Sequence, residues 1–252
     1  MLQEYAEGIV VVGGLVPGLL FDNPDEKHVG SIDVDLALDH EAIQDAGYRT
    51  ILQLLLSRGY VQGNQPFIFY RKVNLKGGEI KVEVDFLAAE YGGTSNQHRT
   101  QKVLDMQPRK ARGCDLAFQE PAIVTIEGAL PEGGEDRVKI RVSKIAPFIL
   151  MKAQALESRL KEKDAYDIYY CLSNFPGGLD RLVEEFRPYR NHPLAAEGLG
   201  ILAEKFQSPE HIGPTLVVNF LEETDPDIRA LIQRDVFERM DYLLRRLGIK
   251  TK

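Results

Sequence analysis

The sequence predicts an α+β fold, with an N-terminal mixed sheet flanked by helices and a C-terminal helical domain. Residues 31–38 alternate polar and apolar side chains with period two, which is typical of a strand with one buried face. Residues 8–12 form a short apolar run that ends in two glycines, as expected for a buried strand before a tight turn. From Ser143 onward apolar residues recur at helical spacing, so we predict two domains, 1–142 and 143–252.

The first domain is predicted to contain several strands and one helix. The helix is expected over residues 41–58, where apolar residues follow a helical period until Arg58-Gly59. In the strand 31–38, Ile32, Val34, Leu36 and Leu38 are expected on the buried face. The predicted strands cover residues 8–12, 31–38, 67–73, 79–87, 122–127 and 138–142.

The second domain is predicted to be entirely helical. Ser143 is a plausible N-cap for its first helix, because its hydroxyl can accept a free backbone N–H. The run Phe175-Pro-Gly-Gly is expected to end the second helix. The predicted helices cover residues 144–161, 164–172, 179–186, 194–206, 214–222 and 226–247.

Composition and charge exclude some classes of protein. No run of eighteen uncharged apolar residues is present, so no membrane span is expected. The net charge of −7 argues against a general nucleic-acid coat, although Arg109-Lys110-Ala-Arg112 is a local basic segment. Cys114 and Cys171 have no metal-type spacing, so we expect packed side chains and a cytoplasmic protein.

Acidic residues on two predicted strands are the main candidates for chemistry. Asp33 and Asp35 project from one face of their strand, and their mutual repulsion requires an offset that a divalent cation provides. Asp85 lies on a polar face of the strand 79–87, together with Glu83. If the two strands are neighbours, either Asp85 or Glu83 completes a three-carboxylate site.

Further residues are expected to contact phosphate. Gly13 and Gly14 allow backbone N–H groups to approach a phosphate closely, although such a pair often marks only a turn. Ser31 is expected on the strand face of Asp33, where its hydroxyl can contact a phosphate oxygen or simply cap the strand. Lys152, Arg159 and Lys163 are spaced to form one basic helix face, which is either functional or merely solvated.

Together these motifs resemble the DNA-polymerase-β-like nucleotidyltransferase superfamily. The pattern is a glycine pair after a strand, then Asp-x-Asp on the next strand, then a single Asp on a later strand. The closer resemblance is to AbiEii/AbiGii-type nucleotidyltransferases and covers roughly residues 8–175. It is carried by VVVGGLVPGLL, HVGSIDVDLALD, KVEVDFL and FILMKAQALESRLKEKDAYDIYYCL.

The resemblance implies roles for individual residues. It makes Asp33, Asp35 and Asp85 the catalytic and metal-binding acids, and it favours Asp85 over Glu83. Lys152 and Asp164 match a lysine and an acid expected to bind the nucleotide. The full set of expected nucleotide-binding residues is Gly13, Gly14, Ser31, Lys152 and Asp164. One departure is the longer stretch between Gly14 and Asp33, with residues 21–27 inserted.

The resemblance also implies an activity. An enzyme of this type, with Mg²⁺ or Mn²⁺, moves a nucleoside monophosphate from a nucleoside triphosphate to an acceptor hydroxyl and releases pyrophosphate. The implied acceptor is a tRNA, a protein or a small molecule. The group includes toxins of toxin–antitoxin systems, so a cognate antitoxin is an expected partner. The alternative is an inactive module of the same fold that binds a nucleotide or a partner. A metal-dependent phosphohydrolase fits the order of motifs less well.

Overall fold

The computed structural model divides the chain into two compact units, which we call the sheet unit and the helical unit. The sheet unit comprises residues 1–20 and 29–144, and the helical unit comprises residues 21–28 and 145–252. The chain therefore enters the helical unit briefly before β2 and returns to it after β8. The structure describes residues 2–21, 27–45, 49–75, 78–92, 98–130 and 133–249.

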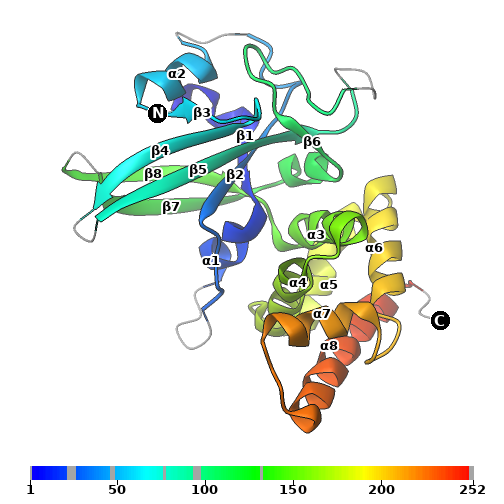
Figure 1. The fold of residues 1–252 in the computed structure, drawn as a ribbon. Helices are drawn as coiled ribbons and strands as arrows, with labels where there is room; N and C mark the ends of the chain where they lie inside the picture. The colour runs from blue at the N-terminus through cyan, green and yellow to red at the C-terminus, as the bar shows by residue number, and fades with distance from the viewer. Residues whose placement is uncertain are drawn as a thin grey trace. The chain divides into compact units, whose positions relative to one another are not determined.

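One mixed sheet of eight strands forms the sheet unit (Figure 1). Its strand order is β3-β4-β5-β2-β1-β8-β7, and β6 pairs with the end of β5 beyond β4. The strands are β1 (Ile9–Val12), β2 (Asp33–Leu38), β3 (Val61–Gln62), β4 (Ile68–Leu75), β5 (Gly78–Ala89), β6 (Arg109–Ala111), β7 (Ala122–Ala129) and β8 (Glu135–Val142).

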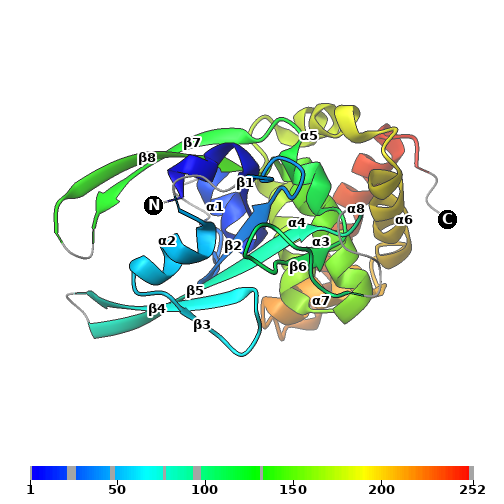
Figure 2. The ribbon, with the colours of Figure 1, turned by 90° about the horizontal axis from the view of Figure 1, so that it is seen from above.

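Two long antiparallel hairpins flank the short central strands. Seen from above, β4–β5 and β7–β8 lie on opposite sides of β1 and β2 (Figure 2). Strand β1 is antiparallel to β2 and parallel to β8, whereas β2 is parallel to β5. The sheet is therefore mixed, as the sequence predicts, and the predicted strands are confirmed with small shifts at their ends.

Short helices complete the sheet unit. The predicted helix 41–58 is wrong over residues 41–45, and residues 46–48 lie outside the described residues. The carboxylate of Asp39 accepts the backbone N–H groups of Glu41 and Ala42, which favours a turn. Helix α2 (Ile51–Ser57) begins only after Thr50, whose side chain forms a capping box with Gln53. The other short elements are α1 (Val16–Leu20) and the 3₁₀ turns η1 (Gln3–Gly8), η2 (Gly13–Leu15) and η3 (Cys114–Phe118).

One face of the sheet packs on the main core of this unit. Phe69 and Phe86 meet edge to face and are fully buried, with Leu38, Ile51 and Leu55 in the same cluster. Burial of such side chains contributes roughly 1.5–3 kcal/mol each to folding.

The strand alternation at β2 is confirmed from Val34 onward but not at Ile32. Val34 and Leu36 pack against the core, and Leu38 is fully buried. Ile32 precedes the strand and is 85% exposed. Its predicted place on the buried face is therefore wrong.

The helical unit consists of six α-helices and one 3₁₀ turn among its described residues (Figure 1). Every predicted helix is confirmed within two residues at each end. Ser143 lies two residues before the first helix, and its hydroxyl bonds the carbonyl of Lys144, so the predicted N-cap is wrong. The elements are α3 (Ile145–Arg159), α4 (Glu162–Asn174), α5 (Gly178–Phe186), η4 (Arg187–Tyr189), α6 (Pro193–Lys205), α7 (Ile212–Phe220) and α8 (Pro226–Arg246).

Both cysteines are buried within their units, as predicted for packed side chains. Burial raises the pKa of Cys114 and of Cys171 far above the ordinary value, so both remain thiols near neutral pH. Within the described ranges, no helix is both long enough and apolar enough to cross a membrane.

Candidate carboxylate site

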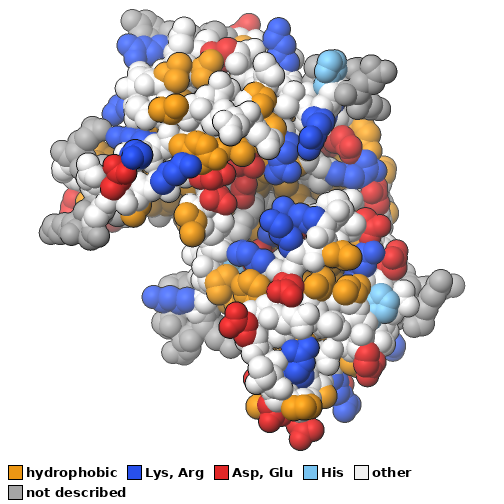
Figure 3. All heavy atoms as spheres, viewed as in Figure 1, with side chains coloured by type: hydrophobic (Ala, Val, Ile, Leu, Met, Phe, Trp, Pro, Cys, Tyr) orange, Lys and Arg blue, Asp and Glu red, His pale blue; other side chains and the backbone are white. Residues whose placement is uncertain are grey.

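The register of β2 and β5 brings the predicted acids together. Asp35 is paired with Asp85, and Asp33 is paired with Glu83, in a parallel ladder. Paired residues project to the same face, and so do residues two positions apart along a strand. Asp33, Asp35, Glu83 and Asp85 therefore form one group, which we call the sheet carboxylates. Figure 3 shows acidic side chains gathered where β2 meets β5.

The predicted adjacency of the two strands is thus correct. Strand neighbours lie about 4.8 Å apart, and residues two apart on a strand lie roughly 6–7 Å apart. Carboxylates on such a grid repel one another unless a cation lies between them. The sequence predicts that these acids lie on strands, and the structure shows that the two strands are neighbours.

Gly13 lies directly against the carboxylate of Asp35. Its φ of +70° is a conformation that glycine adopts without strain. A Cβ at this position would lie 1.8 Å from Asp35 Oδ2. The turn η2 therefore needs a glycine here for two reasons, its backbone angle and the close approach of Asp35. The predicted proximity of the glycine turn to the acids is borne out for Gly13.

Asp85 is largely enclosed by its surroundings. Its side chain is only 15% exposed, and its Oδ1 atom is buried with no hydrogen-bond partner. Its Oδ2 atom lies 3.4 Å from Arg109 Nη2, a long and weak contact. Burial raises the pKa of Asp85 to about 6, against the lowering effect of Arg109 and with further raising by Glu83 and Asp33.

Glu83 has a different environment, because Tyr70 lies across from it on β4. Burial, the charges of Glu83 and Asp33, and a hydrogen bond to Glu83 raise the pKa of the Tyr70 phenol. The phenol donates to the carboxylate of Glu83, since the carboxylate only accepts. Glu83 is thus partly satisfied within the sheet. Asp85, with its unpartnered oxygen, is the better candidate for the third metal-binding acid.

The sheet carboxylates fit a hard divalent cation in their chemistry. Mg²⁺ and Mn²⁺ bind carboxylate oxygens, and Asp85 offers one that is buried and unpartnered. In the described part of the chain, no three acidic, histidine or cysteine side chains are already arranged around one ion position.

Two other predicted phosphate contacts lie near these strands in sequence. Gly14 is buried within η2, next to Gly13. Ser31 lies before β2, which begins at Asp33, so its predicted place on the strand face is wrong. Residues 22–26 of the predicted insertion lie outside the described residues. The roles of Gly14 and Ser31 toward phosphate stay predictions.

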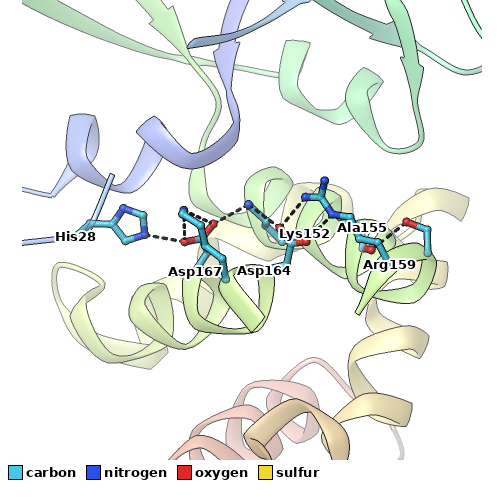
Figure 4. A network of polar contacts seen from close by, with 8 residues as sticks. His28, Lys152, Ala155, Arg159, Asp164 and Asp167 are labelled. Carbon is cyan, nitrogen blue, oxygen red and sulfur yellow. Dashed lines mark hydrogen bonds and ion pairs between the residues drawn. The ribbon is translucent and has the colours of Figure 1, made fainter. Parts of the chain in front are cut away.

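Lys152 and Asp164 belong to the helical unit, where they form part of a buried ion-pair network (Figure 4). Lys152 Nζ lies 2.9 Å from Asp164 Oδ1 and 2.6 Å from Asp167 Oδ2. Arg159 donates to both oxygens of Asp164, at 2.7 and 2.9 Å. We call Lys152, Arg159, Lys163, Asp164, Asp167 and His28 the helix ion-pair network.

The remaining contacts of the network converge on Asp167. Lys163 Nζ lies 3.0 Å from Asp167 Oδ1, and His28 Nε2 lies 2.9 Å from the same atom. The side chains of Asp164 and Asp167 are only 2% and 0% exposed. The network therefore ties α3, α4 and the segment around His28 together.

Electrostatics favour the charged forms of Asp164, Asp167 and Lys152. Burial alone would raise the pKa of Asp164, but Arg159 and Lys152 outweigh it and lower that pKa. Burial likewise opposes ionisation of Asp167, and contacts with His28, Lys152 and Lys163 lower its pKa. Burial would lower the pKa of Lys152, whereas the charges of Asp167 and Asp164 raise it.

The network corrects the predicted basic helix face. Helix α3 ends at Arg159, and Leu160 has a φ of +46°, so Lys163 lies on the next helix. Lys152, Arg159 and Lys163 pair with two buried acids, so they do not form a merely solvated stripe. The expected roles of Lys152 and Asp164 toward a nucleotide stay predictions, and the geometry gives both a structural role.

The sequence did not single out Arg109 or Tyr70 as part of the carboxylate site. Arg109 appeared only within a basic segment, and Tyr70 only within an apolar strand. Their relation to Asp85 and Glu83 depends on the pairing of β4 and β6 with β5. Period-two alternation gives the face of a residue but not its neighbour on the next strand.

The chain has no significant match among protein-family models, curated proteins or solved structures. The case for a function therefore rests on the motifs and on the geometry of the sheet carboxylates.

Proposed function

We propose that the chain is a metal-dependent nucleotidyltransferase. The observation that carries the proposal is the pairing of Asp35 with Asp85 on neighbouring parallel strands, with Asp33 one alternation away and Gly13 against Asp35. The same order of a glycine turn, an Asp-x-Asp strand and a later acidic strand supports transfer over phosphate hydrolysis.

Asp33, Asp35 and Asp85 would hold Mg²⁺ or Mn²⁺, and Glu83 would remain with Tyr70. The metal supplies charge neutralisation at the triphosphate and lowers the pKa of an attacking hydroxyl. The protein's own part is positioning. Strands β2 and β5 fix the acids. The Gly13–Gly14 turn lies against Asp35 at Gly13, and its N–H groups would bind a phosphate oxygen.

The acceptor and the biological role are proposed only as classes. A hydroxyl of a tRNA, a protein or a small molecule would attack the α-phosphate, and pyrophosphate would leave. A toxin paired with a cognate antitoxin is the proposed setting. The chain is acidic overall, so an RNA acceptor would need a local basic surface such as the segment containing Arg109.

Labelled nucleoside triphosphates, each incubated with Mg²⁺, the protein and a cell lysate or total RNA, test the proposal. We expect label in one class of macromolecule, its loss with Asp35→Asn, and its retention with Asp136→Asn. Asp136 is a matched control because its exposed carboxylate lies on the β7–β8 hairpin and accepts only the neighbouring N–H of Arg137 in the described contacts.

Two results would contradict the proposal. Undiminished labelling by the Asp35→Asn variant would show that these acids do not support the reaction. Metal-dependent nucleotide binding without pyrophosphate release, across all acceptors supplied, would instead support the inactive binding module.

A further inference from the structure

Arg109 lies on the same face of the sheet as the sheet carboxylates. It is paired with Leu87 on β5, two residues beyond Asp85, and residues two apart share a face. From this position its guanidinium reaches back to Asp85 Oδ2 at 3.4 Å and lies 5.8 Å from the centroid of the Phe67 ring. The strand pairing therefore aims an arginine at a predicted metal-binding oxygen.

The contact is suited to being made and broken. A strong arginine–carboxylate pair is bidentate and shorter, at about 2.7–2.9 Å. The pair here uses one oxygen at 3.4 Å, and the Arg109 side chain is 39% exposed. The same guanidinium can thus meet a phosphate from solvent without unfolding any strand. By contrast, Arg159 donates two short hydrogen bonds to buried Asp164.

The acids around Asp85 explain why an arginine lies beside it. Asp85 has Asp35 beside it across the ladder, and Glu83 and Asp33 lie nearby. Without a cation such a cluster repels itself, and a nearby positive charge offsets part of that repulsion. A divalent cation that binds Asp85 then meets the positive charge of Arg109 at close range, so the two compete.

We propose that Arg109 is a positioning residue that holds Asp85 before the metal binds and yields it when a nucleoside triphosphate is present. This inference rests on the proposed function. The anionic phosphates give the released guanidinium a new partner, which the free metal does not. Metal and triphosphate therefore bind cooperatively, and the coupling runs through Arg109.

The test is a titration of Mn²⁺ followed by electron paramagnetic resonance, which reports bound metal without any turnover. It compares the full-length protein with Arg109→Gln, Arg109→Lys and Arg137→Gln, each with and without a triphosphate that carries a methylene between its α and β phosphorus atoms. Arg137→Gln is a matched control, because Arg137 forms an exposed ion pair with Glu127 on the β7–β8 hairpin.

We expect Arg109→Gln to bind free Mn²⁺ roughly tenfold more tightly than the wild type, since a competing charge is removed. The same variant should lose most of the gain in Mn²⁺ affinity that the triphosphate gives the wild type. Arg109→Lys should restore part of that gain, and Arg137→Gln should behave as the wild type.

The outcomes separate the inference from the function on which it rests. If Arg109→Gln binds Mn²⁺ with the same affinity as the wild type, both with and without the triphosphate, the inference about Arg109 is overturned and the proposed function is not. A wild type that binds no Mn²⁺ under either condition would overturn the proposed function as well. Circular dichroism shows whether Arg109→Gln still folds. If it does not, Arg109→Lys replaces it in the test, and we then expect a smaller gain in Mn²⁺ affinity from the triphosphate than in the wild type.

Discussion

Two groups of acids in this chain have opposite surroundings. The sheet carboxylates share one face of β2 and β5, and Asp85 among them has a buried oxygen without a partner and one long contact to Arg109. In the helical unit, Asp164 and Asp167 are almost fully buried, yet each is bound by two or more cationic side chains. Asp85 keeps one oxygen without a partner, whereas both acids of the helical unit are paired with cations.

The difference distinguishes an acid with an oxygen left for a ligand from acids that are already bound by cationic side chains. A buried ion pair that is hydrogen-bonded on both sides fixes the arrangement of its helices. A cluster of acids with an unsatisfied oxygen costs stability, and such a cost is typical of binding and catalytic sites. On this basis the sheet carboxylates are the candidate site for a metal ion, and the nucleotide-binding roles of Lys152 and Asp164 stay predictions.

The largest expected effect is a loss of activity without a loss of stability, in a variant of Asp85. Asp85→Asn should lower nucleotidyl transfer by roughly a thousandfold, because one metal-binding carboxylate is lost. Its thermal unfolding temperature should stay unchanged or rise, because the amide removes a charge from a crowded cluster. The amount of labelled product measures the transfer activity, and a thermal melt measures the unfolding temperature. A strong loss of stability together with activity would make Asp85 a structural residue.

Asp167→Asn should lower the stability of the fold, in contrast to Asp85→Asn. Removing this buried partner leaves Lys152 and Lys163 short of negative charge, at an expected cost of about 3 kcal/mol in the free energy of unfolding. Urea denaturation followed by circular dichroism gives the value, since α4 and its neighbours dominate the helical signal. A change below about 1 kcal/mol would show that the network contributes little beyond an exposed pair.

Gly13→Ala tests the contact between the turn and Asp35. A positive φ costs a residue with a Cβ roughly 1–2 kcal/mol, and the new methyl group must displace the carboxylate of Asp35. We expect a loss of stability of that size and a loss of transfer of roughly a hundredfold from the misplaced acid. Gly18→Ala is the control, because a Cβ there meets no atom within 4 Å. Full activity in Gly13→Ala would remove the turn from the site.

Local patterns predicted most of the fold. Period-two alternation located β2 and β5, and helical spacing located α3 to α8, because both reflect burial of one face. Alternation failed at Ile32, which lies before the first residue of β2. The helix predicted from residue 41 ignored a capping box at Thr50 that was legible in the sequence.

The neighbours of each strand were beyond local patterns. The pairing of β2 with β5 joins distant parts of the chain, and only the resemblance suggested that Asp35 and Asp85 meet. Strand β6 is three residues long and carries no alternation, so Arg109 was read only as part of a basic segment. The pairing of Lys152 with Asp164 and Asp167 likewise joins two helices, and helical spacing alone did not predict it.

The smallest expected effect concerns an exposed ion pair that has the same spacing along a helix as the pair at Asp167. Arg234 and Glu238 on α8 are four residues apart, as Lys163 and Asp167 are on α4, but both of their side chains are well exposed. Water screens the exposed pair, and ordering two long side chains costs entropy, so Glu238→Gln should change the free energy of unfolding by at most about 0.5 kcal/mol. The same urea titration measures it beside Asp167→Asn. Equal losses in the two variants would mean that burial does not set the strength of these pairs, and the distinction between the two groups of acids would lose its physical basis.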